Sequence, residues 1–261
     1  CGKTYVLKEF GRREFDSLAY VSCDRNVNLQ AIYSGDFDVA RIIQGLSALT
    51  GVDIIPGKTL IFLDEVQAFP QALEALKYFC EDAPEYHIAV AGSLLGVALH
   101  AGVSFPVGKV QTLRLFPMDF EEFLMAMGEE QLLKLMHSHD YELMNAFHEK
   151  LKDLLRQYYY VGGMPEVVKA FVENKLLNQV RSLQNEILSN YASDFSKHAP
   201  SQEVPRIDMV WQSILGQLSK ENKKFVYGVL KKGGRAKEFE LAIQWLVDAG
   251  LVYKITKVSK P

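Results

Sequence analysis

The feature that most constrains this chain is an uninterrupted apolar run that passes directly into two carboxylates. Residues 60–63, which are Leu, Ile, Phe and Leu, lead straight into Asp64 and Glu65. An apolar run without alternation is typical of a strand buried on both faces, as in the middle of a parallel sheet. Open α/β sheets bind their ligands beyond the carboxyl ends of such strands. The run therefore predicts a central parallel strand with two acids at the ligand-binding edge.

Two adjacent acids at the end of a buried strand match the Walker B pattern of nucleotide-binding proteins. In this pattern Asp64 holds a hydrated Mg²⁺ and Glu65 polarises the attacking water. The alternative interpretation is a buried strand that simply ends in two solvated acids, which is common. Gln67 follows the pair, and we expect it to be a local hydrogen-bonding group.

The beginning of the chain favours the nucleotide interpretation. Residues 1–4 are Cys-Gly-Lys-Thr, the second half of the phosphate-binding motif G-x-x-x-x-G-K-[ST]. Gly2 lets backbone N–H groups approach the phosphates, Lys3 reaches the β and γ oxygens, and the Thr4 hydroxyl binds Mg²⁺. A helix expected over Tyr5–Phe10 directs its positive end at the anion. A triplet of this kind is common by chance, but with the Asp-Glu strand it indicates a nucleotide site.

The first half of this motif and the strand that feeds it are absent from the 261 residues. In a sheet of this type that strand is central. We therefore expect further residues to precede Cys1 in the protein.

Composition narrows the function classes. A hydrophobic content of 48% with 23% charged residues is ordinary for a globular chain, and the net charge of −3 excludes a general attraction to nucleic acid or anionic lipid. Cys1, Cys23 and Cys80 form no C-x-x-C pair, which favours thiols in a reducing compartment. Neither a membrane-spanning run nor a signal peptide is recognisable, so we expect a cytoplasmic protein without membrane contact.

Strands and helices are expected to alternate over residues 1–116. The predicted strands are Ser17–Cys23, Thr59–Asp64, His87–Ser93 and Val110–Phe116. Between them we expect a helix over residues 39–49, capped by Asp36 or Asp38 and closed by Gly51, and another over Phe69–Phe79. This alternation predicts an α/β fold, with a parallel sheet and helices on both of its faces.

Ser93 ends its predicted strand beside the strand that carries Asp64. A polar residue there, at the sensor-1 position of P-loop ATPases, helps to hold the attacking water, so Ser93 joins Glu65 as a catalytic candidate. The alternative is a serine that caps the following helix.

Beyond Pro117 the pattern becomes helical. Apolar residues at helical spacing predict an all-α lid over residues 117–204. Its expected helices are Met118–Leu135, Tyr141–Tyr160, Glu166–Glu173 and Leu176–Tyr191, with a turn at Gly162–Pro165 and a linker at Asp194–Pro200.

Residues 205–261 are expected to form a winged helix. An amphipathic helix ends at Gly250 and passes at once into the β-prone segment Leu251–Ile255, like a third helix and its first wing strand. Residues 220–237 carry seven Lys and Arg against one acid, Glu221. This segment is a candidate for phosphate contact with DNA. The predicted recognition helix is not basic, so a protein-contacting winged helix is the alternative.

These features together resemble a group of prokaryotic AAA+-superfamily ATPases with a P-loop core, a helical lid and a domain of unknown function that begins with a winged helix. The resemblance covers essentially the whole chain. The stretches that carry it, in order, are Gly2–Thr4, Leu63–Gln67, Ala91–Ser93, Phe105–Lys109, Leu115–Phe123 and Gly162–Pro165.

The resemblance implies ATP and Mg²⁺ as cofactors, with Gly2, Lys3 and Thr4 on the nucleotide, Thr4 and Asp64 on the metal, and Glu65 as the base. The chain departs from the group in its incomplete phosphate loop and in ending at Pro261, where members usually continue into another domain. The arginine finger or sensor-2 residue is left open among four candidates: Arg114, Arg156, Arg181 and Arg235.

Three functions compete at this point. The first is an ATPase that hydrolyses ATP through an in-line water. The second is a nucleotide-dependent switch with little turnover, whose winged helix contacts DNA or a protein partner. The third, a small-molecule P-loop kinase, is weaker because Glu65 suits water activation and no arginine-rich lid follows. The sequence leaves the oligomeric state open.

Overall fold

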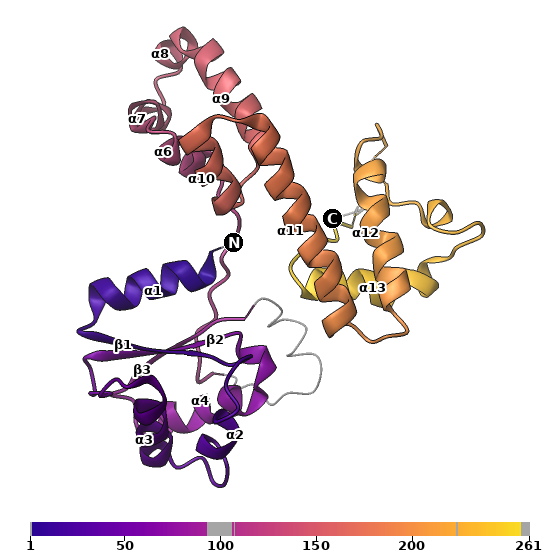
Figure 1. The fold of residues 1–261 in the computed structure, drawn as a ribbon. Coiled ribbons are helices and arrows are strands. Elements are labelled where there is room, and N and C mark those ends of the chain that lie inside the picture. Colours follow the sequence, from indigo (N-terminus) through magenta and orange to yellow (C-terminus); the bar gives the residue numbers. More distant parts are fainter. Residues whose placement is uncertain (1, 93–105, 107, 223, 257–261) are drawn as a thin grey trace. The chain divides into compact units, whose positions relative to one another are not determined.

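The structure is a computed structural model that describes residues 2–92, 106, 108–222 and 224–256 (Figure 1). The chain divides into two compact units. One contains Leu113–Ser193, and the other contains Lys3–Thr112 together with the C-terminal residues from Asp194 onward. Ser93 lies outside the described residues, so its predicted role as a water-holding residue stays a prediction. No helix in the described part of the chain is both long and apolar enough to cross a bilayer.

The described part of residues 3–112 contains a three-stranded parallel sheet. Its strands are β1 (Ser17–Ser22), β2 (Thr59–Asp64) and β3 (His87–Val90), in the order β1-β2-β3. All six residues of β2 are buried, as the uninterrupted apolar run predicts for the middle strand. The register pairs Ser22 with Asp64 and Leu63 with Val90, so the carboxyl ends of the strands meet at one edge.

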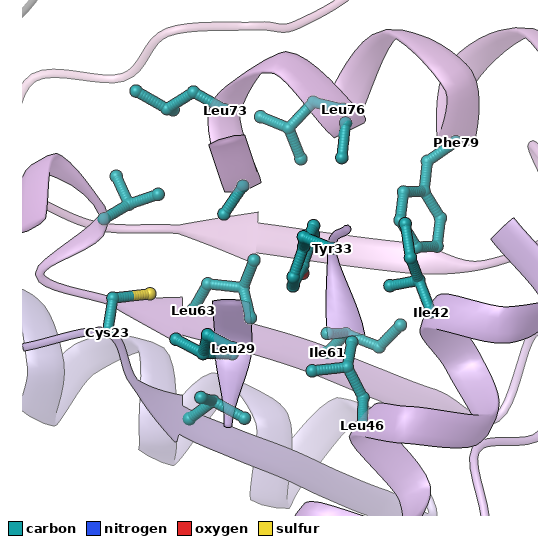
Figure 2. Close-up of a cluster of buried hydrophobic side chains, with 14 of the residues drawn as sticks. Cys23, Leu29, Tyr33, Ile42, Leu46, Ile61, Leu63, Leu73, Leu76 and Phe79 are labelled. Atoms are coloured by element: carbon teal, nitrogen blue, oxygen red, sulfur yellow. The ribbon is translucent and has the colours of Figure 1, made fainter. Parts of the chain in front are cut away.

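Helices cover both faces of this sheet, as predicted (Figure 1). One face carries α1 (Lys3–Glu14), and the other carries α2 (Leu29–Ile32), α3 (Val39–Thr50) and α4 (Pro70–Asp82). Because strand side chains alternate, Ala19, Val21, Ile61 and Leu63 face α2–α4 in the main core, part of which Figure 2 shows. On the other face α1 approaches closely at Gly11, where an added Cβ would lie 2.7 Å from the Leu18 side chain.

The ends of α3 agree with their sequence signals. The Asp38 carboxylate accepts hydrogen bonds from the backbone N–H groups of Ala40 and Arg41, at 2.9 and 3.4 Å, and is the N-cap. Gly51 closes the helix in the left-handed conformation at φ 69°. The helix after β2, α4, also lies where it is predicted.

The expected strand at Val110–Phe116 is wrong. These residues form no strand, and the sheet that the structure describes contains β1, β2 and β3 alone. Residues 111–116 are exposed, and Val110 packs against the main core. A β-prone segment becomes a strand only where a neighbouring strand supplies hydrogen-bonding partners, and sequence periodicity cannot report that neighbour.

The unit Leu113–Ser193 is helical, as expected. Its helices are α6 (Phe120–Ala126), α7 (Glu130–Ser138), α8 (Tyr141–Ala146), α9 (His148–Val161), α10 (Pro165–Asn174) and most of α11 (Leu177–His198). The two long helices predicted before Gly162 are each split in two, near Gly128 and at Phe147. Gly128 has φ 75°, which an α-helix cannot contain. Pro165 begins α10, as predicted.

A backbone clasp holds the entry to this helical unit. The Met118 N–H donates to the Gly163 carbonyl at 2.7 Å, and the Tyr158 hydroxyl donates to the Met118 carbonyl at 2.9 Å. The first residue of α6, Phe120, and the buried Phe123 both contact the Tyr158 ring. The clasp therefore joins the segment before α6 to the turn between α9 and α10.

The C-terminal residues contain α12 (Val204–Leu218), the short 3-10 helix η2 (Tyr227–Val229) and α13 (Ala236–Asp248). The predicted linker at Asp194–Pro200 is wrong, because α11 continues to His198. Phe195 explains the difference. Its side chain is fully buried, and its ring lies edge-on to Trp211 and Trp245, each at 5.5 Å between centroids.

The predicted wing strand is also absent from the described residues 251–256, which have no regular secondary structure. The preceding helix does end as expected, since Gly250 adopts the left-handed conformation at φ 71°. Two helices and a 3-10 turn are present, but without a wing strand the winged helix is not confirmed.

Candidate functional site

The candidate site lies at the carboxyl end of β2, where the strand changes direction. Asp64, the last residue of β2, is only 4% exposed. Glu65 follows with φ 51° and ψ 44°, a left-handed backbone that a non-glycine residue rarely adopts. The Val66 N–H then donates to the carbonyl of Ala91 at 3.0 Å, next to the end of β3. Such backbone strain is typical of functional sites, because the surrounding fold must hold it in place.

The structure brings Thr4 and Asp64 together. The Thr4 hydroxyl donates to Oδ2 of Asp64 at 2.8 Å, although 60 positions separate the two residues in sequence. Thr4 lies in the first turn of α1, and Lys3 is the first residue of that helix. Gly2, which precedes it, is exposed and has φ 81°, a conformation that favours glycine.

Both oxygens of the Asp64 carboxylate accept hydrogen bonds. Oδ1 accepts from the backbone N–H of Glu65 at 3.1 Å, and Oδ2 accepts from the Tyr20 hydroxyl at 3.3 Å as well as from Thr4. Donors on both oxygens hold the carboxylate in one plane. Buried polar atoms need hydrogen-bond partners, and these donors supply them for Asp64.

Glu65 is oriented by its neighbour Gln67. The Gln67 side-chain amide donates to Oε2 of Glu65, as expected for a local hydrogen-bonding group. Glu65 itself is partly exposed, in contrast to Asp64. The pair therefore consists of one buried carboxylate and one that solvent can reach.

The electrostatics of this edge are negative. Burial, with smaller contributions from the carboxylates of Asp64, Asp24 and Glu65, raises the pKa of the Cys23 thiol to about 12. Burial and the charge of Asp64 also raise the pKa of Tyr20, so its phenol keeps its proton and donates to the carboxylate. Carboxylate oxygens at the end of the strand are suitable ligands for a hard cation.

The residues present fit Mg²⁺. A hydroxyl and a carboxylate offer hard oxygen ligands, which Mg²⁺ prefers, and it is usually held by one or two protein groups together with waters and phosphates. Within the described residues no group of three or more His, Cys, Asp or Glu forms a cage for a metal. The donor set at Thr4 and Asp64 therefore suits Mg²⁺ better than a structural Zn²⁺ site.

Sequence reasoning missed Tyr20 and Lys8. The Tyr20 ring lies 5.4 Å from that of Phe62, and the Lys8 ammonium lies 3.5 Å above the centre of the Tyr20 ring. The sequence did contain a signal for Tyr20. Strand alternation places its side chain on the face of β1 that α1 covers, which is the face where Thr4 lies. Four arginines remain candidates for the finger or sensor-2 role, and all of them are exposed: Arg114, Arg156, Arg181 and Arg235.

Comparisons with known proteins agree with this architecture. Residues 1–124 match the family described as "AAA domain", and residues 152–261 match a domain of unknown function, DUF8612. No curated protein matches the chain. The Walker-type ATPase PABY2304 of Pyrococcus abyssi has a similar structure, with a TM-score of 0.56 and 12% identity over 95% of this chain and 81% of that one. At that identity the likeness shows the fold alone, and together with the AAA match it supports the fold of a P-loop ATPase.

Proposed function

We propose that the N-terminal unit binds ATP and hydrolyses it with Mg²⁺. The observation that carries this proposal is the hydrogen bond from Thr4 to the buried Asp64, at 2.8 Å. It joins a helix start to the carboxyl end of a central parallel strand, where α/β proteins bind nucleotides. The match of residues 1–124 to an AAA domain supports the same activity.

Each residue of the site has a distinct role in this proposal. Gly2 and the first N–H groups of α1 bind phosphate oxygens, Lys3 neutralises the β and γ oxygens, and Thr4 and Asp64 hold the metal. The metal, when bound, supplies charge stabilisation for the phosphate oxygens.

The reaction itself falls to the second acid. Glu65 accepts a proton from the water that attacks the γ-phosphate in line, and Gln67 orients its carboxylate through the hydrogen bond to Oε2. Ser93 is proposed to help hold that water. Catalysis of this kind comes from positioning and charge, so the left-handed backbone at Glu65 has a function in aiming the side chain.

Substitution of Glu65 in the full-length protein tests the chemistry. Glu65→Gln keeps the shape of the side chain and removes its basicity, so ATP binding should be retained and turnover should fall by about 100-fold or more. Lys3→Ala should instead weaken ATP binding, because it removes a phosphate contact. Glu85→Gln, an exposed glutamate just before β3, is a matched control that should change neither.

The second candidate is a nucleotide-dependent switch with little turnover. The switch requires the same residues for nucleotide binding, but it does not require Glu65 as a catalytic base. Turnover measured with and without DNA separates the two. A Glu65→Gln protein that hydrolyses ATP at the wild-type rate would contradict the role of Glu65 as the base.

We further propose that the C-terminal residues form a winged-helix-like module coupled to the ATPase and that this module contacts DNA. The supporting feature is charge, because residues 194–261 carry 12 Lys and Arg against 7 Asp and Glu in a chain of net charge −3. Six cations of residues 220–237 are exposed: Lys220, Lys224, Lys231, Lys232, Arg235 and Lys237. Phe225 and Tyr227, whose rings lie 5.1 Å apart, are interleaved with them.

Charge reversal tests this contact. Replacement of Lys223, Lys224, Lys231 and Lys232 by Glu should abolish DNA binding and leave ATP turnover without DNA unchanged. Binding of the wild type should fall steeply with salt, because each phosphate contact releases counterions. If DNA binding survives the charge reversal, the contact lies outside these four lysines. If the wild type does not bind DNA at low salt, a protein partner is favoured.

A further inference from the structure

We propose that Tyr20 is a positioning residue for the metal-binding carboxylate of Asp64 and that Lys8 holds the Tyr20 ring in place. The proposal rests on the proposed function, since it assigns Tyr20 to the Mg²⁺ site of that reaction. It adds two residues that neither the phosphate-binding motif nor the Asp-Glu pair contains.

The first support is the shared acceptor. Thr4 and Tyr20 both donate to Oδ2 of Asp64, at 2.8 and 3.3 Å, from α1 and β1 respectively. When the Thr4 oxygen is engaged by a metal, the phenol remains a fixed donor on the same carboxylate oxygen. Outer donors of this kind fix the orientation of a metal-binding side chain.

The second support is the geometry of the sheet. β1 and β2 are in parallel register, with Tyr20 opposite Phe62 and Ser22 opposite Asp64. Tyr20 therefore lies opposite the residue two positions before Asp64, on the same face of the sheet. The phenol side chain is long enough for its hydroxyl to reach the Asp64 carboxylate. A Phe at this position would keep the ring contact with Phe62 and lose only the hydroxyl.

The third support is the clamp on the ring. Lys8 lies one helical turn after Thr4 on α1, and its ammonium is 3.5 Å above the ring centre of Tyr20. A cation at this distance is attracted by the negative face of the ring. One turn of α1 therefore supplies both the metal-binding hydroxyl of Thr4 and the group that holds the Tyr20 ring.

The test is Tyr20→Phe in the full-length protein, with the affinity for Mg²⁺ measured by titration calorimetry in the presence of a non-hydrolysable ATP analogue. We expect about 10-fold weaker Mg²⁺ binding, the lower end of the usual range for an outer-shell partner. Affinity for the analogue without metal should be unchanged. The apparent KM for Mg²⁺ in turnover should rise, and kcat at saturating Mg²⁺ should be retained.

Three further variants complete the experiment. Lys8→Met should weaken Mg²⁺ binding by about 2- to 5-fold, and Lys8→Arg should restore it, because a guanidinium also binds a ring face. Tyr86→Phe removes a hydroxyl from another half-buried tyrosine of the same unit and should have no effect. Asp64→Asn sets the scale for complete loss of the carboxylate charge.

The outcomes separate the two proposals. If Asp64→Asn weakens Mg²⁺ binding and Tyr20→Phe does not, the inference on Tyr20 is wrong and the proposed function stands. If Asp64→Asn leaves Mg²⁺ binding unchanged, the metal site of the proposed function is wrong. If Tyr20→Phe lowers metal-free nucleotide affinity by the same factor, Tyr20 supports the fold and does not position Asp64, which also overturns the inference.

Discussion

The backbone clasp of the helical unit gives the sharpest prediction of stability. A Cβ added at Gly163 would lie 2.0 Å from the Met118 carbonyl oxygen, whereas real Cβ atoms essentially never approach within 3.0 Å. The obstacle is backbone, so no side-chain rotation can relieve it. Gly163→Ala must therefore push the Met118 segment away from the turn between α9 and α10.

The expected cost follows from the bonds that this movement breaks. Two hydrogen bonds meet at Met118, at 2.7 Å to the Gly163 carbonyl and 2.9 Å from the Tyr158 hydroxyl. At about 0.5–1.5 kcal/mol each, their loss lowers the free energy of unfolding of the helical unit by about 1–3 kcal/mol. Tyr158→Phe removes one of the two and should cost about half as much.

Hydrogen exchange of the amides of α9 and α10, followed by mass spectrometry, measures this change directly. Tryptophan fluorescence adds a readout of the C-terminal residues, because both tryptophans, Trp211 and Trp245, lie there. Gly216→Ala is the matched control. Gly216 is interior to α12, and apart from its chain neighbours and the nearby backbone of the helix no atom lies within 4 Å of an added Cβ, so alanine should stabilise by about 0.5–1 kcal/mol. Unchanged exchange in α9 and α10 of Gly163→Ala would refute the reasoning.

Two further predictions concern residues 3–112. Asp38→Ala removes the N-cap of α3, where the carboxylate binds two backbone N–H groups, and should lower stability in urea unfolding by about 1 kcal/mol; an equal loss in Asp36→Ala, whose residue is not the cap, would argue against capping. The raised pKa of Cys23 keeps its thiol protonated, so peptide-resolved alkylation at pH 8 should modify the exposed Cys80 and spare Cys23. Because the folded pKa of about 12 exceeds the value of 9.0 for an unperturbed thiol, the contribution of Cys23 to stability is complete below pH 9.0 and is lost as the pH rises toward 12. Cys23→Ser should remove this part of the alkaline destabilisation, and rapid alkylation of native Cys23 would contradict its burial.

The sequence by itself determined the features whose physical cause is local. An uninterrupted apolar run removes all of its side chains from water only when both faces of the strand are buried. The strand β2 and the position of Asp64 at its end could therefore be predicted. The cap at Asp38, the left-handed Gly51 and Pro165 at the start of α10 depend on backbone conformations that those residues favour on their own. The pairing of Thr4 with Asp64 could also be predicted. A Gly-Lys-Thr triplet followed later by a buried strand that ends in Asp-Glu places both residues at the same edge of one sheet.

Tertiary structure decided the features whose cause lies elsewhere in the chain. Residues 110–116 and 251–256 have strand-like composition but form no strand, because ladder hydrogen bonds must come from a neighbour that composition does not identify. The helix α11 continues through Asp194–His198, where polar residues suggest a linker, because Phe195 is buried against two tryptophans from later helices. In the sequence Tyr20 is only one aromatic residue of a β-prone run. The register of β1 and β2 places its hydroxyl 3.3 Å from Oδ2 of Asp64. Such contacts are non-local, and only the folded chain specifies them.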